Sequence, residues 1–261
     1  MTGGSCDLKG KVALVTGGNG GIGLGMAEGL AAAGCDLVIW GGNPDKNAAA
    51  EAKLKAHGRR VLVQKVDVAN EQQVEDAFGT ALKSMGRIDG CFANAGVSQK
   101  RAAFHELSTA EWRRVLSVNL DGAFFTLRAA ARHMVERAKD GDKAGGRLVG
   151  MASTASVHGA ARAESYAASK GAMVSVIRAL AVEMARYGIT ANSILPGWIE
   201  TEMTAGGVAD PKFSGNVLPR IPHRRWGQPA DFAGIAVYLM SDASSYHTGD
   251  SFLIDGAYTI F

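Results

Sequence analysis

The stretch VALVTGGNGGIG, residues 12–23, decides the fold, because a short apolar run passes directly into a glycine-rich turn. Residues 12–16 are almost all apolar, which predicts a strand buried on both faces. Glycines at 17, 21 and 23 let the backbone turn tightly and approach a ligand closely. A helix that begins at this turn points its unpaired N–H groups at it, which favours phosphate binding.

A turn between a strand and a helix is the context that a dinucleotide-binding loop requires. We therefore expect the turn to hold the pyrophosphate of a dinucleotide. The expected contacts are Gly17, Asn19, Gly21, Ile22 and Gly23. The alternative is an ordinary strand–helix turn that binds nothing.

The pattern of this first unit repeats along the chain. Short apolar runs predict strands at residues 12–16, 37–40, 61–66, 90–93, 147–151, 190–195 and 251–254. Amphipathic stretches predict helices at residues 21–33, 44–57, 71–85, 109–138, 165–186 and 229–239. This alternation predicts an α/β fold, a doubly wound parallel sheet of about seven strands with helices on both faces.

One segment interrupts the rhythm, at residues 197–227, which contain four glycines before Gly227 and prolines at 211, 219 and 222. A long irregular segment inside a compact domain is usually a lid or a binding loop. No linker or low-complexity tract divides the chain. We expect one domain over residues 1–261, with a substrate lid at about 198–226.

Composition and charge argue against several classes of protein. The formal net charge is only +3 in 261 residues, and basic pairs such as Arg59 with Arg60 are short, so no nucleic-acid partner is expected. No apolar run approaches the ~20 residues of a membrane span. The N-terminal MTGGSCDLKG lacks the apolar region of a secretory signal. These features predict a cytoplasmic protein.

The cysteines and histidines do not predict a metal site. Cys6, Cys35 and Cys91 are far apart, and the six histidines are scattered. Cys35 and Cys91 lie in apolar surroundings, where a cysteine packs as a small hydrophobic residue.

The segment SYAASKGA, residues 165–172, carries a pattern typical of proton transfer. Tyr166 and Lys170 are four residues apart and share one face of the predicted helix. An ammonium near a tyrosine stabilises the phenolate and lowers its pKa from about 10. Such a tyrosine gives a proton to a carbonyl oxygen or takes one from an alcohol.

Two further polar residues belong to the same candidate site. Ser153 ends the preceding strand, so its hydroxyl is expected near Tyr166 in the ligand crevice. Asn119 lies in the middle of a predicted helix, where asparagine is unfavourable. That position indicates either a bound water or a helix break, with a surface-exposed side chain as the alternative.

A second dinucleotide signal follows the third predicted strand, at Asp67 and Val68. A carboxylate at the end of a strand can accept a hydrogen bond from an adenine amino group. The alternative is that Asp67 caps the next helix.

These elements together resemble the short-chain dehydrogenase/reductase family over essentially the whole chain. The resemblance rests on TGGNGGIG at 16–23, Asp67, ANAG at 93–96, Asn119, Ser153, Tyr166 with Lys170, PGWIET at 196–201 and SFLIDGAY at 251–258.

The resemblance implies a role for each catalytic residue. Tyr166 would be the acid and base, and Lys170 would lower its pKa and hold the nicotinamide ribose. Ser153 would orient the substrate oxygen, and Asn119 would anchor a water that links Lys170 to solvent. The implied reaction is hydride transfer between NAD(P) and a small-molecule alcohol or carbonyl compound.

The resemblance also implies further cofactor contacts. Asn94, with Ala95 and Gly96, would brace the central strands beside the adenosine. Around the nicotinamide it implies Pro196, Gly197, Ile199 and Thr201, with the Ile199 backbone and the Thr201 hydroxyl at the carboxamide.

The sequence departs from the usual pattern for cofactor choice. Dinucleotide folds place an acidic residue, or a nearby arginine, at the end of the second strand, but VIWGGN has Gly41 and Gly42 there. The basic position before Gly21 is also a glycine. We lean to NAD, whose 2′-hydroxyl can bond to backbone or to Asn43. NADP is the alternative, with Lys46, Arg59 or Arg60 as its partner.

Substrate and assembly follow from the resemblance as expectations. The substrate pocket would use residues 94–101, 155–162 and 198–226, with Arg101, His158 and Arg162 as polar contacts. Large side chains of the last segment either contact substrate or pack within the lid: Trp198, Met203, Phe213, Leu218 and Trp226. The predicted helices around 108–134 and 168–184 are apolar on more than one face, so one face of each must meet something beyond its own sheet. The resemblance implies that these two helices form the dimer surface, and we expect a homotetramer, with a dimer as the second choice.

Two alternatives to an alcohol dehydrogenase remain. One is a 3-oxoacyl-thioester reductase of the same family. The other is a nucleotide-binding regulator without catalysis, which the intact set Asn119, Ser153, Tyr166 and Lys170 argues against.

Overall fold

The computed structural model describes residues 6–142 and 145–261, so the first five residues of the N-terminal segment lie outside the described part. The described strands form one seven-stranded parallel sheet in the order β3-β2-β1-β4-β5-β6-β7. The strands are β1 (Val12–Thr16), β2 (Asp36–Gly41), β3 (Val61–Lys65), β4 (Gly90–Ala93), β5 (Gly146–Met151), β6 (Ile189–Pro196) and β7 (Ser251–Ile254). The predicted doubly wound sheet is confirmed, and each strand lies within one residue of its predicted ends.

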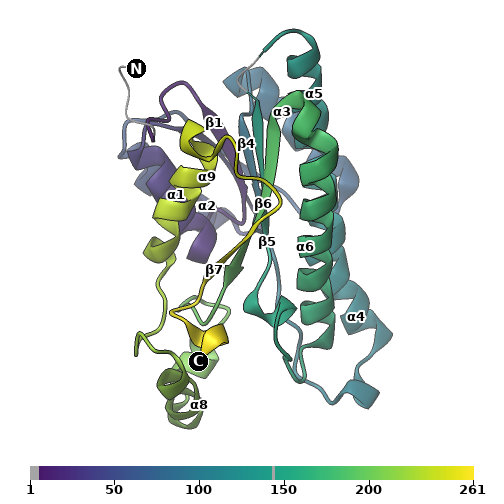
Figure 1. Ribbon diagram of the computed structural model, residues 1–261, viewed down its shortest axis with the longest axis vertical. Coiled ribbons are helices and arrows are strands. Elements are labelled where there is room, and N and C mark those ends of the chain that lie inside the picture. Colours follow the sequence, from purple (N-terminus) through teal and green to yellow (C-terminus); the bar gives the residue numbers. More distant parts are fainter. Residues whose placement is uncertain (1–5, 143–144) are drawn as a thin grey trace.

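The alternation of side chains along β1 explains how both faces of the sheet are covered. Val12 and Leu14 belong to one buried cluster, and Ala13 and Val15 belong to the other. In Figure 1, α1, α2 and α9 lie on one side of the sheet, and α3, α5 and α6 on the other. These helices are α1 (Gly21–Ala32), α2 (Pro44–Lys55), α3 (Glu71–Met85), α5 (Gly122–Lys139), α6 (Glu164–Met184) and α9 (Ala233–Met240).

Three predicted elements differ from the structure. The helix predicted at 229–239 begins with a 3-10 turn (Pro229–Phe232) before α9. The helix predicted at 109–138 is divided into α4 (Thr109–Leu116), a π-helical turn (Ser117–Asp121) and α5. The segment expected to be irregular contains two short helices, α7 (Ala205–Ala209) and α8 (Pro211–Val217). Asp210 caps α8 through a hydrogen bond from the Lys212 N–H to its carboxylate, 2.9 Å long, and Pro211 follows it at the first helical position.

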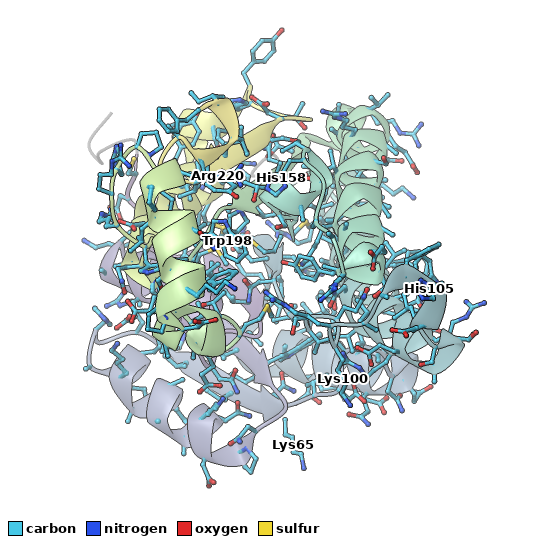
Figure 2. All side chains as sticks on the ribbon, turned by 90° about the horizontal axis from the view of Figure 1, so that it is seen from below. Lys65, Lys100, His105, His158, Trp198 and Arg220 are labelled. Atoms are coloured by element: carbon cyan, nitrogen blue, oxygen red, sulfur yellow. The ribbon has the colours of Figure 1, made fainter. Side chains whose placement is uncertain are left out.

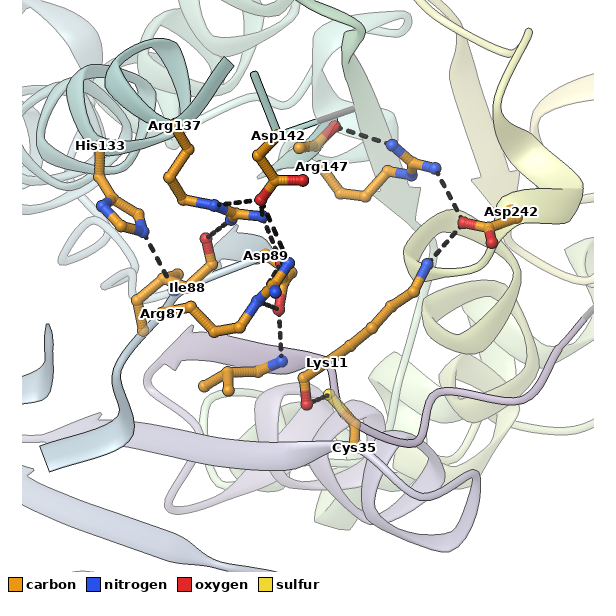
Figure 3. Close-up of polar contacts among 12 residues, drawn as sticks. Lys11, Cys35, Arg87, Ile88, Asp89, His133, Arg137, Asp142, Arg147 and Asp242 are labelled. Atoms are coloured by element: carbon orange, nitrogen blue, oxygen red, sulfur yellow. Dashed lines mark hydrogen bonds and ion pairs between the residues drawn. The ribbon is translucent and has the colours of Figure 1, made fainter. Parts of the chain in front are cut away.

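The amino-terminal end of the sheet is closed by charged side chains (Figure 3). The buried Asp89 carboxylate accepts a hydrogen bond from the Val12 N–H at 2.9 Å and forms ion pairs with Arg87 and Arg137. Arg147, also buried, lies 3.5 Å from Asp242. Buried charges are tolerated only when they are paired in this way. These ion pairs stabilise the amino ends of the strands. The carboxyl ends of the strands lie at the opposite edge of the sheet, where a ligand can bind.

The prediction that Cys35 and Cys91 pack as small hydrophobic residues is confirmed. Cys35 and Cys91 are fully buried, and burial raises the pKa of the Cys91 thiol to about 12. Within residues 6–142 and 145–261, none of the helices is both long and apolar enough to cross a bilayer.

Candidate active site

A cleft of about 310 Å³ opens at the carboxyl ends of β1, β4, β5 and β6. The strand order reverses between β1 and β4, and ligands of open α/β sheets bind at such a point. Most of the predicted site residues line this one cleft: Gly17, Asn19, Gly21, Ile22, Gly23, Asn94, Ala95, Gly96, Ser153, Tyr166, Lys170, Pro196, Gly197, Ile199 and Thr201.

The glycine-rich turn has the backbone geometry that a phosphate loop needs. Gly17 and Gly21 have φ angles of +64° and +50°, a region that side chains disfavour. A Cβ at Gly23 would lie 2.3 Å from the Gly17 carbonyl oxygen, so the turn closes only around glycine there. The first N–H groups of α1 have no acceptor within the helix. The turn therefore fits a dinucleotide pyrophosphate.

Asn94 ties the first strand to the fourth beside this turn. Its side-chain amide donates to the Thr16 carbonyl oxygen at 2.8 Å. The Thr16 hydroxyl oxygen in turn accepts hydrogen bonds from the N–H groups of Asn94 and Ala95, at 3.0 and 2.9 Å. These contacts hold the ends of β1 and β4 at a constant separation, which shapes the floor of the cleft.

Tyr166 and Ser153 meet inside the cleft. Ser153 follows β5 and accepts a hydrogen bond from the Ala155 N–H at 3.1 Å, which starts the 3-10 turn Thr154–Ser156. Burial raises the pKa of Tyr166, and its hydrogen bond with Ser153 lowers that pKa in part. Serine and tyrosine hydroxyls side by side form a pair that one substrate oxygen can bridge.

Lys170 is buried one helical turn beyond Tyr166. Its ammonium donates to the Met151 carbonyl oxygen at 2.8 Å, and it lies 5.6 Å from the centre of the Tyr166 ring. Burial lowers the pKa of Lys170 to about 8. In the chain alone, burial raises the pKa of Tyr166. The lowering of this pKa by Lys170 stays a prediction.

Asn119 lies in the π-helical turn and is 1% exposed, so the alternative of a surface position is wrong. Its side chain bonds both backbone groups of Val97, accepting from the N–H at 2.7 Å and donating to the carbonyl at 3.0 Å. It also donates to the Ser169 hydroxyl at 3.1 Å. Because π turns commonly mark functional sites, the helix break belongs to the site.

Gly96 lies between Asn119 and Lys170. A Cβ at this glycine would lie 3.2 Å from the Asn119 amide oxygen and 3.4 Å from the Lys170 ammonium. The glycine therefore leaves the approach to both groups open.

Gln99, a residue that the sequence analysis did not single out, fastens the start of α6. Its buried amide oxygen accepts from the Ser165 N–H at 2.8 Å and from the Ser165 hydroxyl at 2.6 Å. Ala163, at the N-cap of α6, makes no side-chain cap bond. The cap thus comes from a residue 66 positions earlier, which no local pattern predicts.

Three predicted cofactor contacts do not line the cleft. Asn43 caps α2, and its side-chain oxygen accepts from the N–H groups of Asp45 and Lys46. The Asp67 carboxylate accepts from the Ala69 N–H at 3.0 Å, and Val68 is buried. The suggestion that Asp67 caps α3 is wrong.

The end of β2 is filled by amide side chains. Asn19 donates to the Asn47 side-chain oxygen at 2.7 Å, and Asn47 donates to the Gly41 carbonyl at 3.0 Å. A Cβ at Gly41 would lie 2.2 Å from the Asn19 amide nitrogen, whereas a Cβ at Gly42 has open space. A side chain is therefore accommodated at position 42 and not at position 41.

The three cations considered for a 2′-phosphate lie in different places. Arg60 pairs with Asp36 at 2.7 Å, and Arg59 donates to the Gly34 carbonyl, both at the amino ends of the strands and away from the cleft. Lys46 alone of the three lines the cleft, and its ammonium forms an ion pair with Glu202. Glu202 is a cleft residue that the sequence analysis missed, because the contact spans 156 residues.

Hydrogen bonds join the two ends of the segment 198–226, and others stabilise its first turn beside the cleft. Gly227 pairs with Trp198 and Glu200 through backbone hydrogen bonds of 3.0 and 2.8 Å. The Thr204 hydroxyl accepts from the Thr201 N–H at 3.0 Å and donates to the Ile199 carbonyl at 2.5 Å. Thr204 was missed, although a threonine three residues after Thr201 is a local turn signal.

Most large side chains of this segment pack against one another. Phe213 and Trp226 stack at 6.3 Å, and Trp198 meets Phe213 edge-on at 5.2 Å. Leu218 joins the same cluster, which surrounds Tyr258. Packing within the lid is therefore the better interpretation for these four, while Met203 lines the cleft and is half exposed.

Two arginines lie against rings of this aromatic cluster, and Figure 2 labels one of them, Arg220. Arg220 lies 4.6 Å from the centre of the Tyr258 ring, and Arg101 lies 5.6 Å from that of Phe213. The His158 ring meets Tyr258 edge-on at 5.7 Å, and Figure 2 places it beside Arg220. Arg162, the third polar contact expected for the substrate, donates its backbone N–H to the Glu164 carboxylate at 2.9 Å.

Comparison with known proteins gives consistent matches over nearly the full length of the chain. A family model described as enoyl-(acyl carrier protein) reductase matches residues 17–259. A 2-dehydro-3-deoxy-D-gluconate 5-dehydrogenase of Escherichia coli (strain K12) is 38% identical over 96% of each chain. A 3-oxoacyl-[acyl-carrier-protein] reductase of Chlamydia pneumoniae is 34% identical, over 97% of this chain and 98% of the relative.

A solved structure shares the fold closely. The gluconate 5-dehydrogenase of Burkholderia cenocepacia J2315, in complex with NADP and tartrate, has a TM-score of 0.91 and 35% identity, with 98% of each chain covered.

Proposed function

This chain belongs to the short-chain dehydrogenase/reductase family, and we propose that Tyr166 serves as the acid and base of its hydride-transfer reaction. The chain is an NAD(P)-dependent oxidoreductase that acts on CH–OH groups. The observation that carries the proposal for Tyr166 is its position beside Ser153 and Lys170 in the cleft that the glycine-rich turn borders. The bound nicotinamide ring supplies the hydride acceptor or donor.

The residues of the cleft divide the remaining work. The glycine-rich turn would hold the pyrophosphate, and Lys170 would hold the nicotinamide ribose. Ser153 and Tyr166 hold the substrate oxygen between their hydroxyl groups. In alcohol oxidation, the Tyr166 oxygen takes the hydroxyl proton as the carbinol carbon loses its hydride; in reduction, Tyr166 returns that proton to the carbonyl oxygen.

The protonation state of Tyr166 bears on the pH dependence of the two directions. A tyrosine of ordinary pKa, about 10, is protonated at neutral pH and can donate to a carbonyl. Burial raises the pKa of Tyr166 further in this direction. Oxidation needs the phenolate, so it is favoured by alkaline pH.

For the substrate we propose a hydroxylated carboxylic acid. Arg101 lies on the Phe213 ring of the lid and Arg220, itself in the lid, lies on the Tyr258 ring; neither pairs with a carboxylate in the part of the chain that the structure describes. Cations in this position favour an anionic substrate. Relatives named for gluconate and its dehydro forms act on such acids.

A panel of matched substrates tests the proposal. Purified protein is assayed with NAD⁺ and NADP⁺ against D-gluconate and D-sorbitol, which differ by a carboxylate in place of a CH₂OH group. It is assayed in reduction with 5-keto-D-gluconate and with acetoacetyl-coenzyme A. We expect kcat/KM for the acid to exceed that for the polyol by at least about tenfold.

The outcomes separate the candidates. Turnover of acetoacetyl-coenzyme A alone would favour the 3-oxoacyl reductase, which the Chlamydia pneumoniae relative makes the second candidate. Equal turnover of the acid and the polyol contradicts the proposal for an acid. If the protein binds a dinucleotide but turns over none of these substrates, the result favours the nucleotide-binding regulator without catalysis.

A further inference from the structure

A cation of the cleft lining comes from α2. In dinucleotide folds, the residues at the end of the second strand meet the adenine ribose. Here that strand ends in Gly41, and Lys46 in the first turn of α2 lines the cleft together with Asn19 and Gly20. A 2′-phosphate on this side of the cleft would therefore meet Lys46.

Glu202 reaches the same place from the lid. The residue before it, Thr201, lies against the glycine-rich turn, since a Cβ at Gly21 would lie 3.4 Å from the Thr201 methyl group. Glu202 itself lines the cleft and pairs with Lys46. The Glu202 carboxylate, which comes from the lid, therefore neutralises Lys46. Of Lys46, Arg59 and Arg60, Lys46 alone lines the cleft.

The pair can respond to a ligand because both side chains are partly in solvent, with 41% of Lys46 and 79% of Glu202 exposed. Ion pairs with this exposure contribute little to folding. A charged group of a ligand can therefore break this ion pair and bind one of the two side chains without a large loss of folding free energy.

We propose that the Lys46–Glu202 ion pair determines cofactor choice, with Glu202 disfavouring a 2′-phosphate by occupying Lys46. The inference rests on the proposed function, since it assumes that a dinucleotide lies in the cleft. A 2′-hydroxyl carries no charge and is indifferent to the pair, whereas a phosphate must displace or face the Glu202 carboxylate. Glu202 thus supplies the repulsive element that specificity needs and that β2 lacks at Gly41.

Binding measurements on four variants test the proposal. Dissociation constants for NAD⁺, NADP⁺, 5′-AMP and 2′,5′-ADP are measured by calorimetry at one fixed salt concentration. The variants are Glu202→Gln, Lys46→Met, the double variant, and Glu200→Gln as a charge-matched control. Glu200 accepts a hydrogen bond from Gln228 at 2.7 Å and is absent from the cleft lining.

We expect Glu202→Gln to bind NADP⁺ and 2′,5′-ADP about tenfold more tightly, as a freed ammonium gains a charge-assisted hydrogen bond to phosphate. Its affinity for NAD⁺ and 5′-AMP should change by less than about twofold. In the double variant the gain should fall below about threefold, because the cation is missing. Glu200→Gln should behave as wild type.

Two results overturn the proposal. One is a gain in NADP⁺ affinity below about threefold in Glu202→Gln while NAD⁺ binding is intact. The other is a gain that persists at about tenfold without Lys46. Intact NAD⁺ binding shows in each variant that the cleft has formed. Failure of the wild type to bind either dinucleotide refutes the proposed function itself, and so the two failures are distinguishable.

Discussion

At the scale of single residues, Tyr166 carries the proposal for catalysis. Its hydroxyl meets Ser153, and burial raises its pKa. The Ser169 hydroxyl lacks this position, because it donates to the Tyr166 carbonyl oxygen at 2.7 Å and accepts from Asn119. Removal of the Tyr166 oxygen should therefore abolish proton transfer without disturbing the helix.

We expect Tyr166→Phe to fold and bind dinucleotide but to lose at least ~10²-fold in kcat, the scale of general acid–base catalysis. Steady-state kinetics and calorimetry on the same preparation measure the two quantities. Wild-type turnover in this variant on any true substrate would show that another group moves the proton.

The pH profile depends on the Ser153 hydrogen bond. This bond lowers the pKa of Tyr166, so its loss raises that pKa. Oxidation requires the phenolate, so we expect Ser153→Ala to move the rise of kcat/KM for oxidation to higher pH.

The reverse reaction provides the control for that shift. Reduction requires the protonated phenol, so its decline at high pH should move in the same direction and by the same amount. If Ser153→Ala changes kcat/KM but shifts neither pH profile, Ser153 positions the substrate and does not stabilise the phenolate.

At the scale of secondary-structure elements, the end of β2 decides whether an anion-binding side chain can be added. A Cβ at position 42 would meet no atom within 4 Å, whereas a Cβ at position 41 would clash with Asn19 and Asn47. We expect Gly42→Arg to shift the ratio of kcat/KM for NADP over NAD upward by about tenfold, since a guanidinium bonds a phosphate at two points.

Gly41→Arg is the matched variant. Its Cβ would lie 2.2 Å from the Asn19 amide nitrogen and 2.3 Å from the Asn47 amide oxygen. We expect it to lower the free energy of unfolding by roughly 1–3 kcal/mol, the usual cost of overpacking, without the gain for NADP. Denaturant titration measures the first quantity. Equal stability of the two variants would contradict the packing seen at β2.

At the scale of the whole molecule, the outer faces of α5 and α6 leave apolar side chains in solvent. Val182 on α6 is 83% exposed, and Phe124 on α5 is 47% exposed. Exposed apolar groups on two neighbouring helices are typical of a contact surface. They support the expectation that these helices form the dimer surface of a homotetramer.

Light scattering at micromolar concentration should give a mass near four times 27.2 kDa. We expect Val182→Glu to reduce that mass, because a buried unpaired carboxylate is costly at an interface. Ala52→Glu, at an exposed position of α2, is the control and should leave the mass unchanged. A monomeric wild type would exclude both the tetramer and the dimer.

Local patterns in the sequence determined the strands, the glycine-rich turn and the Tyr166–Lys170 spacing. Each depends on neighbours in the chain: an apolar run, the need for positive φ at Gly17 and Gly21, or a single helical turn. The alternation of strands and helices was enough to predict the sheet, because parallel strands require crossovers.

Only the tertiary structure decided the features that join distant segments. The cap of α6 by Gln99, the amides that fill the end of β2 and the pairing of Lys46 with Glu202 each link residues far apart in the chain. The pKa of Tyr166 belongs to the same group. Its direction depends on how deeply the fold buries the phenol, and the spacing of Lys170 in the sequence holds no information about that burial.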